Sequence, residues 1–421
     1  MTALRFCMVT TFYPPHGFGG DALFVQNLAR AVARRGHEVT VVCNRDAYAV
    51  LHPDGAPPVS DDGADGVVVH RLDSPLGALA LLLTQQTGRA AANAPALERI
   101  FERGRFDVVH YHNVSLLGGP GAFLYGDGVK LYTAHEHWLV CPTHVLWRFD
   151  REPCPARKCL RCTLRAGRPP QLWRRGGVVA TNLDEIDAFI AMSEFSRRKH
   201  HEFGFPREME VMPGFLHDEP PEDSGDATPH DRPYFLFAGR LERMKGLDDV
   251  IPLFRDYPHA DLLIAGDGTH RAALEKIAAG SPRVRFLGRM PHRALGPYYR
   301  HALAAIVPTA GYETFGLAVI DALSHGTPVL ARRIGPLPEL IETSGGGATF
   351  ATPDELAALL RHVQCDEVAR SAMSHAARAG YEAHWSEGVV VPRYLDLVAR
   401  VADGRGNRRV ADALSGAGAT A

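Results

Sequence analysis

The sequence lacks a hydrophobic run long enough to cross a membrane. Its longest apolar stretch, Leu76–Leu83, has eight residues, whereas a membrane-spanning helix needs about 20. The first 15 residues also lack the basic leader and apolar segment of a signal peptide. We therefore expect a cytoplasmic protein.

The sequence also lacks an excess of charge of either sign. Its 46 lysines and arginines nearly balance its 48 acidic residues, which leaves a net charge of -2 at pH 7. This balance excludes a general binder of nucleic acid or other polyanions. Only five of the basic residues are lysines, so each lysine is a residue to inspect for function.

The length of 421 residues exceeds what one hydrophobic core normally organises, and two domains are expected. Residues 213–233 are rich in proline, glycine and acidic residues, as linkers are. The expected parts are an N-terminal domain (1–213), a linker (214–233), a C-terminal domain (234–384), a helix packing back on the N-terminal domain (385–402) and a flexible tail (403–421).

Both halves alternate between short apolar runs and helix-like patterns. Leu4–Thr10 and His37–Cys43 are typical of buried strands, and Asp21–Arg35 has the spacing of an amphipathic helix, with Asp21 as its N-cap and Gly36 at its end. Further strands are expected at 67–72, 106–110, 129–133, 189–192, 210–212, 234–238, 261–265, 284–287, 304–307 and 328–331, and further helices at 247–255, 271–279 and 317–325. The pattern predicts an α/β fold with two Rossmann-like doubly wound parallel sheets, whose ligands would bind at the carboxyl ends of the strands in a cleft between the domains.

The second half carries two cations directly after an expected strand. Gly239-Arg240 follows strand 234–238, and Lys245-Gly246 precedes a helix. Arginine offers a bidentate fork and lysine a point charge, so the pair predicts a phosphate site. Surface salt bridges to Glu242 or Asp248 are the alternative, and the spacing leaves both open.

A second motif, Gly311-Tyr312-Glu313-Thr314-Phe315-Gly316-Leu317, leads from a strand into a helix that carries Asp321. Backbone N–H groups at such a helix start can point at a phosphate. Glu313 and Asp321 would bracket a long ligand. Alternatively, Glu313 is an acid favoured by the helix dipole and Asp321 a solvated helix residue.

Taken in order and spacing, these motifs resemble retaining glycosyltransferases of family 4, which have the GT-B fold and include the glycosyl transferases group 1. The residues concerned are Gly239-Arg240-Leu241, Lys245-Gly246, Ala265-Gly266-Asp267-Gly268, Phe286-Leu287-Gly288 and Glu313 to Asp321, with Gly19-Gly20, residues 35–41 and Thr133-Ala134-His135 in the first half. The resemblance extends to about residue 385. It implies transfer of a hexosyl group from a nucleoside diphosphate sugar to an acceptor hydroxyl, without a catalytic metal.

The resemblance also implies roles for single residues. Arg240 and Lys245 would neutralise the donor diphosphate, and Glu313 would contact the donor sugar near the reacting centre. His135 would contact that sugar or position the acceptor, with Glu136 and His137 as alternates. The remaining donor-binding residues would be Gly19, Gly20, Gly268, Arg289, Met290, Phe315, Gly316, Leu317 and Asp321. The family usually has glutamate where this chain has the shorter Asp321.

The resemblance leaves the substrates open. Uridine is the expected donor base and GDP-mannose the alternative; the acceptor would be a saccharide, a lipid-linked sugar or a natural product, and no nucleic acid is expected. The oligomeric state is not indicated. Other interpretations are a GT-B-fold phosphorylase or epimerase, or a non-catalytic zinc-containing binding module. A pyridoxal phosphate phosphorylase would need a Schiff-base lysine, and Lys245 is better explained by phosphate.

Four cysteines form an unusual cluster in the first half. Cys141, Cys154, Cys159 and Cys162 lie within 22 residues, inside an insertion at 138–173. The spacing predicts a structural zinc held by four thiolates. Two disulfides or reduced thiols are the alternatives, and His137 or His144 could replace a cysteine ligand.

Basic residues surround these cysteines. They are Arg157, Lys158, Arg161, Arg165, Arg168, Arg174 and Arg175. They form either a solvated face or an anion-recognising patch, for an acidic acceptor or for peripheral contact with lipid phosphates. The sequence does not decide between these interpretations.

Overall fold

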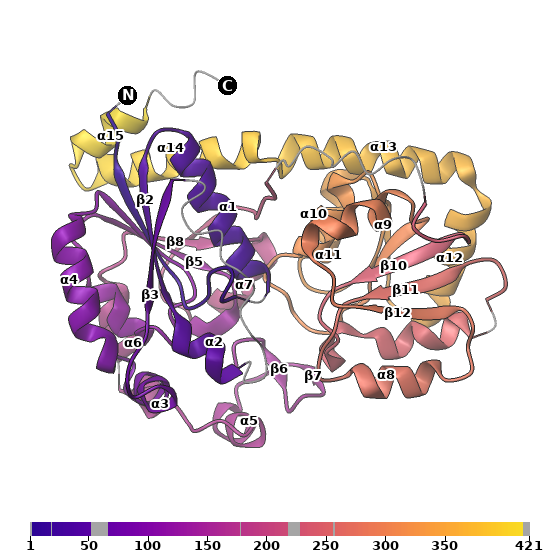
Figure 1. The fold of residues 1–421 in the computed structure, drawn as a ribbon, viewed down its shortest axis with the longest axis horizontal. Coiled ribbons are helices and arrows are strands. Elements are labelled where there is room, and N and C mark those ends of the chain that lie inside the picture. The colour runs from indigo at the N-terminus through magenta and orange to yellow at the C-terminus, as the bar shows by residue number, and fades with distance from the viewer. Residues whose placement is uncertain are drawn as a thin grey trace. The chain divides into compact units, whose positions relative to one another are not determined.

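The computed structural model describes residues 2–17, 19–51, 66–176, 178–217, 228–255 and 257–415. The chain divides into two compact units (Figure 1). The first unit comprises Met1–His144, Arg157–His217 and Glu387–Ala421, and the second comprises Val145–Ala156 and Asp218–Ser386. Residues 145–156 of the expected N-terminal insertion thus belong to the second unit. Residues 218–227 of the expected linker lie outside the described residues.

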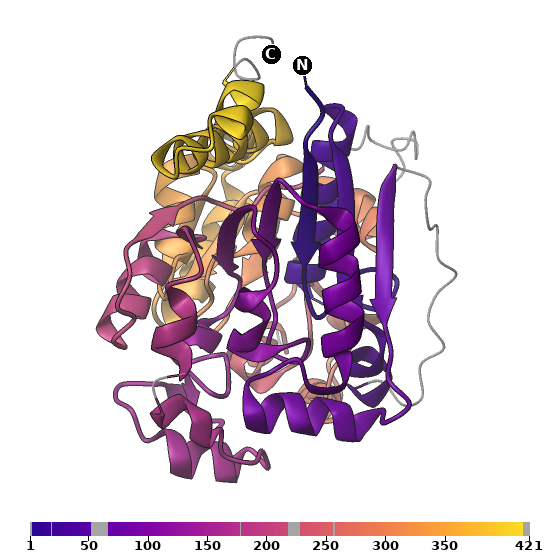
Figure 2. The same ribbon diagram turned by 90° about the vertical axis from the view of Figure 1, so that its left-hand side faces the viewer.

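The first unit is built on a seven-stranded parallel sheet with the order β3-β2-β1-β4-β5-β8-β9. Its strands are β1 (Arg5–Val9), β2 (Glu38–Asn44), β3 (Val67–Leu72), β4 (Val108–Tyr111), β5 (Val129–Ala134), β8 (Ala188–Ala191) and β9 (Met209–Val211). Phe6 of β1 pairs with Val39 on one side and Val108 on the other. Every residue of β4 and β5 is buried, because helices cover both faces of a doubly wound sheet (Figure 2).

The main helices of this unit are α1 (Gly20–Arg34), α2 (Arg45–Leu51), α3 (Ala78–Thr87), α4 (Ala94–Gly104), α5 (Cys159–Arg165), α6 (Val178–Leu183) and α7 (Glu194–Glu202). The apolar stripe expected on α1 is buried. Its predicted N-cap is wrong: Gly19 occupies the cap position, and Asp21 lies in the first turn. The Asp21 carboxylate instead accepts a hydrogen bond of 3.3 Å from Asn113 Nδ2.

The C-terminal helices α14 (Glu387–Gly404) and α15 (Arg408–Leu414) belong to the first unit. Helix α14 packs against α1 and β5. A flexible tail was expected from residue 403 onward. The structure instead has helix α15 in this segment, and α15 buries Val410 and Leu414. The side chain of Asn407 caps α15 by accepting from the N–H of Val410. Residues 416–421 lie outside the described residues.

The second unit is built on a six-stranded parallel sheet with the order β12-β11-β10-β13-β14-β15. Its strands are β10 (Tyr234–Ala238), β11 (Asp261–Ala265), β12 (Val284–Gly288), β13 (Ala304–Val307), β14 (Val329–Arg332) and β15 (Gly347–Phe350). A short antiparallel pair, β6 (Trp147–Arg148) and β7 (Glu152–Pro153), belongs to the same unit. The two parallel sheets confirm the predicted fold class.

The helices of this unit are α8 (Arg271–Ala278), α9 (Gly296–Arg300), α10 (Leu317–Ser324), α11 (Leu337–Ser344), α12 (Pro353–Cys365) and α13 (Glu367–His384). The helix predicted at 247–255 is wrong: this segment forms two 3-10 helices, Leu247–Asp249 and Ile251–Phe254. Pro252 lacks the N–H that a continuous α-helix would use there. Among the helices that the structure describes, none is long and apolar enough to span a bilayer.

Candidate active site

The loops at the carboxyl ends of β10, β11 and β13 are joined backbone to backbone. The Gly239 N–H donates to the Ala265 carbonyl at 3.0 Å, and the Leu241 N–H donates to the Asp267 carbonyl at 2.9 Å. The Ala310 N–H donates to the Met244 carbonyl at 2.7 Å. The predicted motif residues of the second unit therefore lie on loops that support one another.

Glycine is required where these loops meet. Gly266 has a φ of +143°, and a Cβ added to it would lie 1.9 Å from the Gly239 carbonyl oxygen. A Cβ on Gly268 would lie 2.4 Å from the Leu241 carbonyl oxygen. Close packing of the loops thus accounts for both glycines, and the donor contact predicted for Gly268 stays a prediction.

Lys245 and Glu313 form an ion pair at this edge of the sheet. Lys245 Nζ lies 2.7 Å from Glu313 Oε1, and the two side chains are 23% and 20% exposed. Burial on its own would raise the pKa of Glu313, but Lys245, with smaller effects of Thr309 and Arg240, lowers this pKa below its usual range. Glu313 is therefore ionised at neutral pH, and it holds the lysine in place.

Arg240 is more accessible than Lys245. Its Nη1 lies 2.7 Å from Glu242 Oε1, while its side chain is 55% exposed. The salt bridge considered as the alternative thus forms with Glu242, whereas Asp248 pairs with His270. An exposed ion pair contributes about 0–1 kcal/mol, so exchanging Glu242 for a ligand phosphate costs little.

The start of α10 offers backbone donors next to this ion pair in the sequence. Phe315 is buried, and Gly316 caps the helix with a φ of +147°. A Cβ on Gly316 would lie 2.9 Å from Leu340 Cδ1, so the leucine would have to shift, and the φ of Gly316 is one that other residues rarely adopt. The first N–H groups of a helix have no acceptor within it, and those at Leu317 and its neighbours suit an anion.

Asp321 is buried on α10 and already has partners. Its Oδ2 lies 3.1 Å from His292 Nε2, its Oδ1 lies 4.0 Å from His325 Nε2, and it hydrogen-bonds Tyr299. It is therefore not the solvated helix residue of the alternative interpretation. The predicted contact with ribose stays a prediction, as do the donor contacts of Arg289 and Met290, which lie just after β12.

In the first unit, three histidines form a row at the carboxyl ends of β4 and β5. His110 Nε2 lies 2.8 Å from Thr133 Oγ1, and His110 Nδ1 lies 3.1 Å from the Tyr394 hydroxyl. His112 Nδ1 lies 2.9 Å from His135 Nε2. The His110 and His112 rings are 4.0 Å apart. We call His110, His112 and His135 the histidine row.

Burial keeps the histidine row uncharged. It lowers the pKa of His110 and of His135 to about 3, and that of His112 well below its usual value. His112 Nε2 is buried, with no hydrogen-bond partner among the residues that the structure describes. Neutral imidazoles donate and accept hydrogen bonds, which suits hydroxyl groups better than phosphates.

The start of α1 lies against this row. Phe24 of α1 contacts the His135 ring, with 5.0 Å between the ring centroids. Gly19, the N-cap of α1, has a φ of +95°, which favours glycine, and Gly20 begins the helix. The structure thus brings α1 to His135, and the donor contacts of both glycines stay predictions.

Glu136 and His137, the residues considered in place of His135, make other contacts. His137 is buried and stacks on His200, with 5.2 Å between the ring centroids. Glu136 Oε1 lies 2.7 Å from His144 Nδ1. Sequence reasoning missed His110 and His112, although two histidines spaced by one residue at the end of an expected strand were a signal for them.

The cysteines are all free of disulfides. Burial foremost, and also the neighbouring Cys141 and Cys162, raises the pKa of Cys159. Within the described ranges, no group of three or more histidine, cysteine or acidic side chains is placed to hold a metal ion. The zinc site at Cys141, Cys154, Cys159 and Cys162 therefore stays a prediction.

Comparisons with known proteins agree with this fold. Residues 18–219 match the model of Glycosyltransferase Family 4, and residues 219–380 match that of Glycosyl transferases group 1. A D-inositol 3-phosphate glycosyltransferase of Catenulispora acidiphila is 28% identical, over 88% of this chain and 90% of its own length.

Two solved structures are similar in fold. A sucrose-phosphate synthase from Thermosynechococcus elongatus aligns with a TM-score of 0.72 and 17% identity, covering 95% of this chain and all of its own. Anabaena HepE in complex with UDP aligns with a TM-score of 0.59 and 16% identity, covering 98% and 99%. Together with the two family matches, these likenesses identify the chain as a glycosyltransferase that belongs to family 4 and has the GT-B fold.

Proposed function

We propose that this glycosyltransferase moves a hexosyl group from a UDP-sugar to an acceptor hydroxyl, with retention of the anomeric configuration. The observation that carries the proposal is the Lys245–Glu313 ion pair of 2.7 Å, set on the loops that also present Arg240. The similarity to HepE, which was solved with UDP, favours uridine as the base.

The charged groups of the second unit suit the leaving diphosphate. As the bond between the anomeric carbon and the phosphate oxygen breaks, negative charge builds up on the diphosphate and positive charge on the sugar. Lys245, Arg240 and the amides at the start of α10 would stabilise the diphosphate, as preorganised cations and dipoles do. Glu313 would orient Lys245 and favour the positive charge on the sugar.

The reaction needs no covalent intermediate with the protein. The acceptor oxygen bonds to the anomeric carbon on the face that the diphosphate leaves, and the acceptor proton passes to the departing phosphate oxygen. His135, which is neutral, would hydrogen-bond hydroxyl groups of the sugar or of the acceptor. We propose a hydroxyl-rich acceptor, either a saccharide, a lipid-linked sugar or a natural product, because the relative from Catenulispora acidiphila is named for an inositol phosphate.

Ligand-induced shifts of the thermal midpoint test the donor. A ligand at about 100 times its Kd adds roughly 2.7 kcal/mol to stability, so UDP should raise the midpoint clearly more than GDP or ADP. Lys245→Ala should abolish the shift, whereas Arg243→Ala, an exposed neighbour, should keep it. A shift with GDP alone would point to a GDP-mannose donor, and no shift with any of the three would contradict a nucleotide-sugar enzyme.

Nuclear magnetic resonance of the product tests the stereochemistry. With a UDP-α-sugar, the coupling constant of the anomeric proton should report an α-linked product from its first appearance. A β-linked first product would show inversion and would overturn the retaining mechanism.

A further inference from the structure

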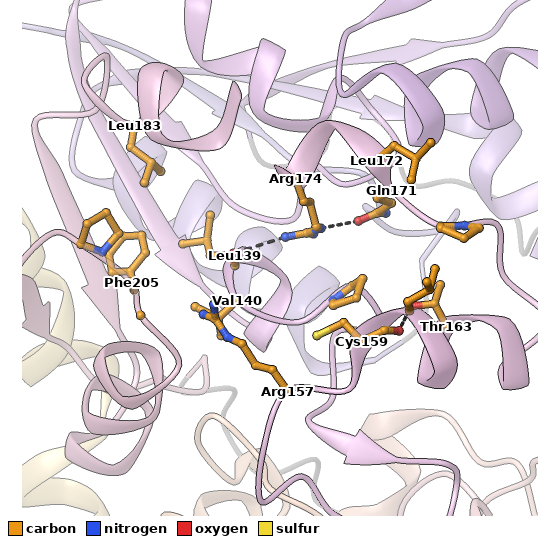
Figure 3. A pocket seen from close by; sticks show the side chains of 15 residues that line it. Leu139, Val140, Arg157, Cys159, Thr163, Gln171, Leu172, Arg174, Leu183 and Phe205 are labelled. Carbon is orange, nitrogen blue, oxygen red and sulfur yellow. Dashed lines mark hydrogen bonds between the residues drawn. The ribbon is translucent and has the colours of Figure 1, made fainter. Parts of the chain in front are cut away.

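The first unit contains a cavity of about 440 Å³ beside α5 and the 3-10 helix Leu172–Arg175, which we call the α5 cavity. Its walls are largely apolar (Figure 3) and include Leu139, Val140, Leu160, Leu172, Leu183 and Phe205. Small-molecule sites commonly have volumes of roughly 300–1,000 Å³ and apolar walls with a few polar groups. The α5 cavity has these properties, and none of the residues lining it is a predicted donor or catalytic residue.

One of its polar groups is the guanidinium of Arg174. Its Nη1 donates to the Leu139 carbonyl at 3.3 Å, and its Nε donates to the Gln171 side chain. Its Nη2 is buried, and among the described residues it has no hydrogen-bond partner. A buried charged donor without a hydrogen-bond acceptor costs free energy of folding. An acceptor supplied by a ligand would remove this cost at Arg174 Nη2.

The orientation of Arg174 is fixed by two aromatic rings. Its guanidinium carbon lies 4.8 Å from the Trp173 ring centroid and 5.2 Å from that of Trp138. Burial lowers the pKa of Arg174 to about 10, so the group is still charged at neutral pH. The carboxylate that acts on Arg174, Glu136, has a smaller effect on its pKa than Cys141 and is itself paired with His144. The Arg174 guanidinium is therefore a positive charge in a fixed orientation, and it forms no ion pair with Glu136.

A second arginine borders the same cavity. Arg157 lies against Gly204, where an added Cβ would come within 3.1 Å of Arg157 Nη2. Among the described residues that line the cavity, none is acidic. Leu160 and Leu172, which also line it, are 43% and 65% exposed. The cavity thus combines two cations with apolar surface that continues to its rim.

From these contacts we propose that the α5 cavity binds an oxyanion group, a phosphate or a carboxylate, that is attached to an apolar body. The oxyanion accepts from Arg174 Nη2 and is paired with Arg157, and the apolar body packs on the leucines and Phe205. This assigns two members of the basic group around the cysteines to an anion site. The proposal does not depend on the identity of the sugar donor.

Tryptophan fluorescence tests the proposal, because Trp138 and Trp173 contact the guanidinium. Octyl phosphate should change the emission saturably, and inorganic phosphate and octanol should bind at least about tenfold more weakly, since each lacks one half of the interaction. Octanoate reports whether a carboxylate serves as well as a phosphate. Equal binding of octyl phosphate and octanol, or no saturable change with octyl phosphate, would overturn the proposal.

Variants locate the site. Arg174→Gln should weaken octyl phosphate binding about tenfold or more. Arg165→Gln, at the end of α5 and outside the cavity lining, is the control and should change the binding less than about twofold. Isothermal calorimetry provides the affinity where the substitution alters the fluorescence itself. If circular dichroism shows that Arg174→Gln does not fold, Arg157→Gln tests the site instead. Arg157 is exposed, so its substitution should leave the fold intact. Unchanged affinity in a folded Arg174→Gln or in Arg157→Gln would refute the assignment.

Discussion

The carboxyl edge of the first sheet is lined by uncharged histidines, whereas the carboxyl edge of the second sheet holds ion pairs. In the first unit, burial lowers the pKa of His110 and His135 to about 3, and each imidazole finds a neutral partner. In the second, Lys245 and Glu313 remain partly exposed and stay charged as a pair. Two sheets of one fold class therefore differ at their carboxyl edges: one edge carries uncharged polar side chains and the other carries charged ones.

The difference follows from how each edge is packed. The histidines lie beneath α1 and α14, so desolvation dominates their titration. The second edge is a set of loops held by backbone contacts, which leaves its charged side chains near solvent. A neutral edge suits hydroxyl groups and a charged edge suits a diphosphate, and the following predictions test this division.

The largest effect is expected from Glu313. Glu313→Gln removes the charge that positions Lys245, so kcat should fall about 100-fold or more, with little change in the KM for the donor. Initial rates of UDP release measure both constants. Glu342→Gln, on the exposed face of α11, is the control, and a Glu313→Gln enzyme within threefold of wild type would contradict a role in transition-state stabilisation.

The next effect concerns the backbone packing of the second edge. Gly266→Ala would place a Cβ 1.9 Å from a carbonyl oxygen, and we expect a loss of stability of about 3 kcal/mol or failure to fold. Gly280→Ala is the matched control: its φ is +80°, but no atom lies within 4 Å of the added Cβ, so only about 1 kcal/mol is expected. Urea unfolding compares them, and equal losses would show that loop contact is unimportant.

Acid should destabilise the first unit through its histidines. An unfolded histidine titrates near pH 6.5, and His135 titrates at about pH 3 in the folded state. Protonation therefore favours unfolding: stability is complete above about pH 6.5 and falls as the pH drops toward 3, by roughly 1.4 kcal/mol per pH unit for each such histidine.

Thermal midpoints between pH 7.5 and 5 measure this slope. His135→Gln should reduce the slope by the contribution of one buried histidine. His375→Gln, at an exposed position on α13, should leave the slope unchanged. The same slope in His135→Gln and wild type would mean that folding does not lower the pKa of His135.

The smallest effect is expected from Arg240. Because its salt bridge to Glu242 is exposed, Arg240→Ala should leave the thermal midpoint within about 1 °C. The KM for the donor should still rise about fivefold or more, because the diphosphate contact that we propose for Arg240 would be lost. A clear drop of the midpoint with an unchanged KM would show that Arg240 is structural.

Much of the fold could be predicted from local sequence patterns. Strands β10, β11 and β13 have the expected bounds, because buried parallel strands appear as short, mostly apolar runs between turn residues. The bounds of β3 are also as expected, although this edge strand is only partly buried. The cations and the acid of the second edge were also found, since their motifs follow strands directly along the chain.

The remaining features depend on contacts between distant segments. The histidine row needs β4, β5 and α14 together, and no spacing in the sequence reveals that Tyr394 reaches His110. Helix α15 was missed because its glycine- and arginine-rich surroundings conceal a short apolar face. The unpaired Nη2 of Arg174 likewise appears only when the two tryptophans are placed around it.

The return of α14 and α15 to the first unit has a consequence for how the protein is made. Residues 1–217 leave the ribosome before residues 387–415 are added, so the first unit stays incomplete while residues 218–386 of the second unit are synthesised. During that time, Arg34 and Arg35 lack Glu387, and Asp107 lacks Arg409. The nascent first unit would therefore expose the apolar surface that α14 later covers, and a chain that stops before residue 387 would be a substrate for chaperones and proteases.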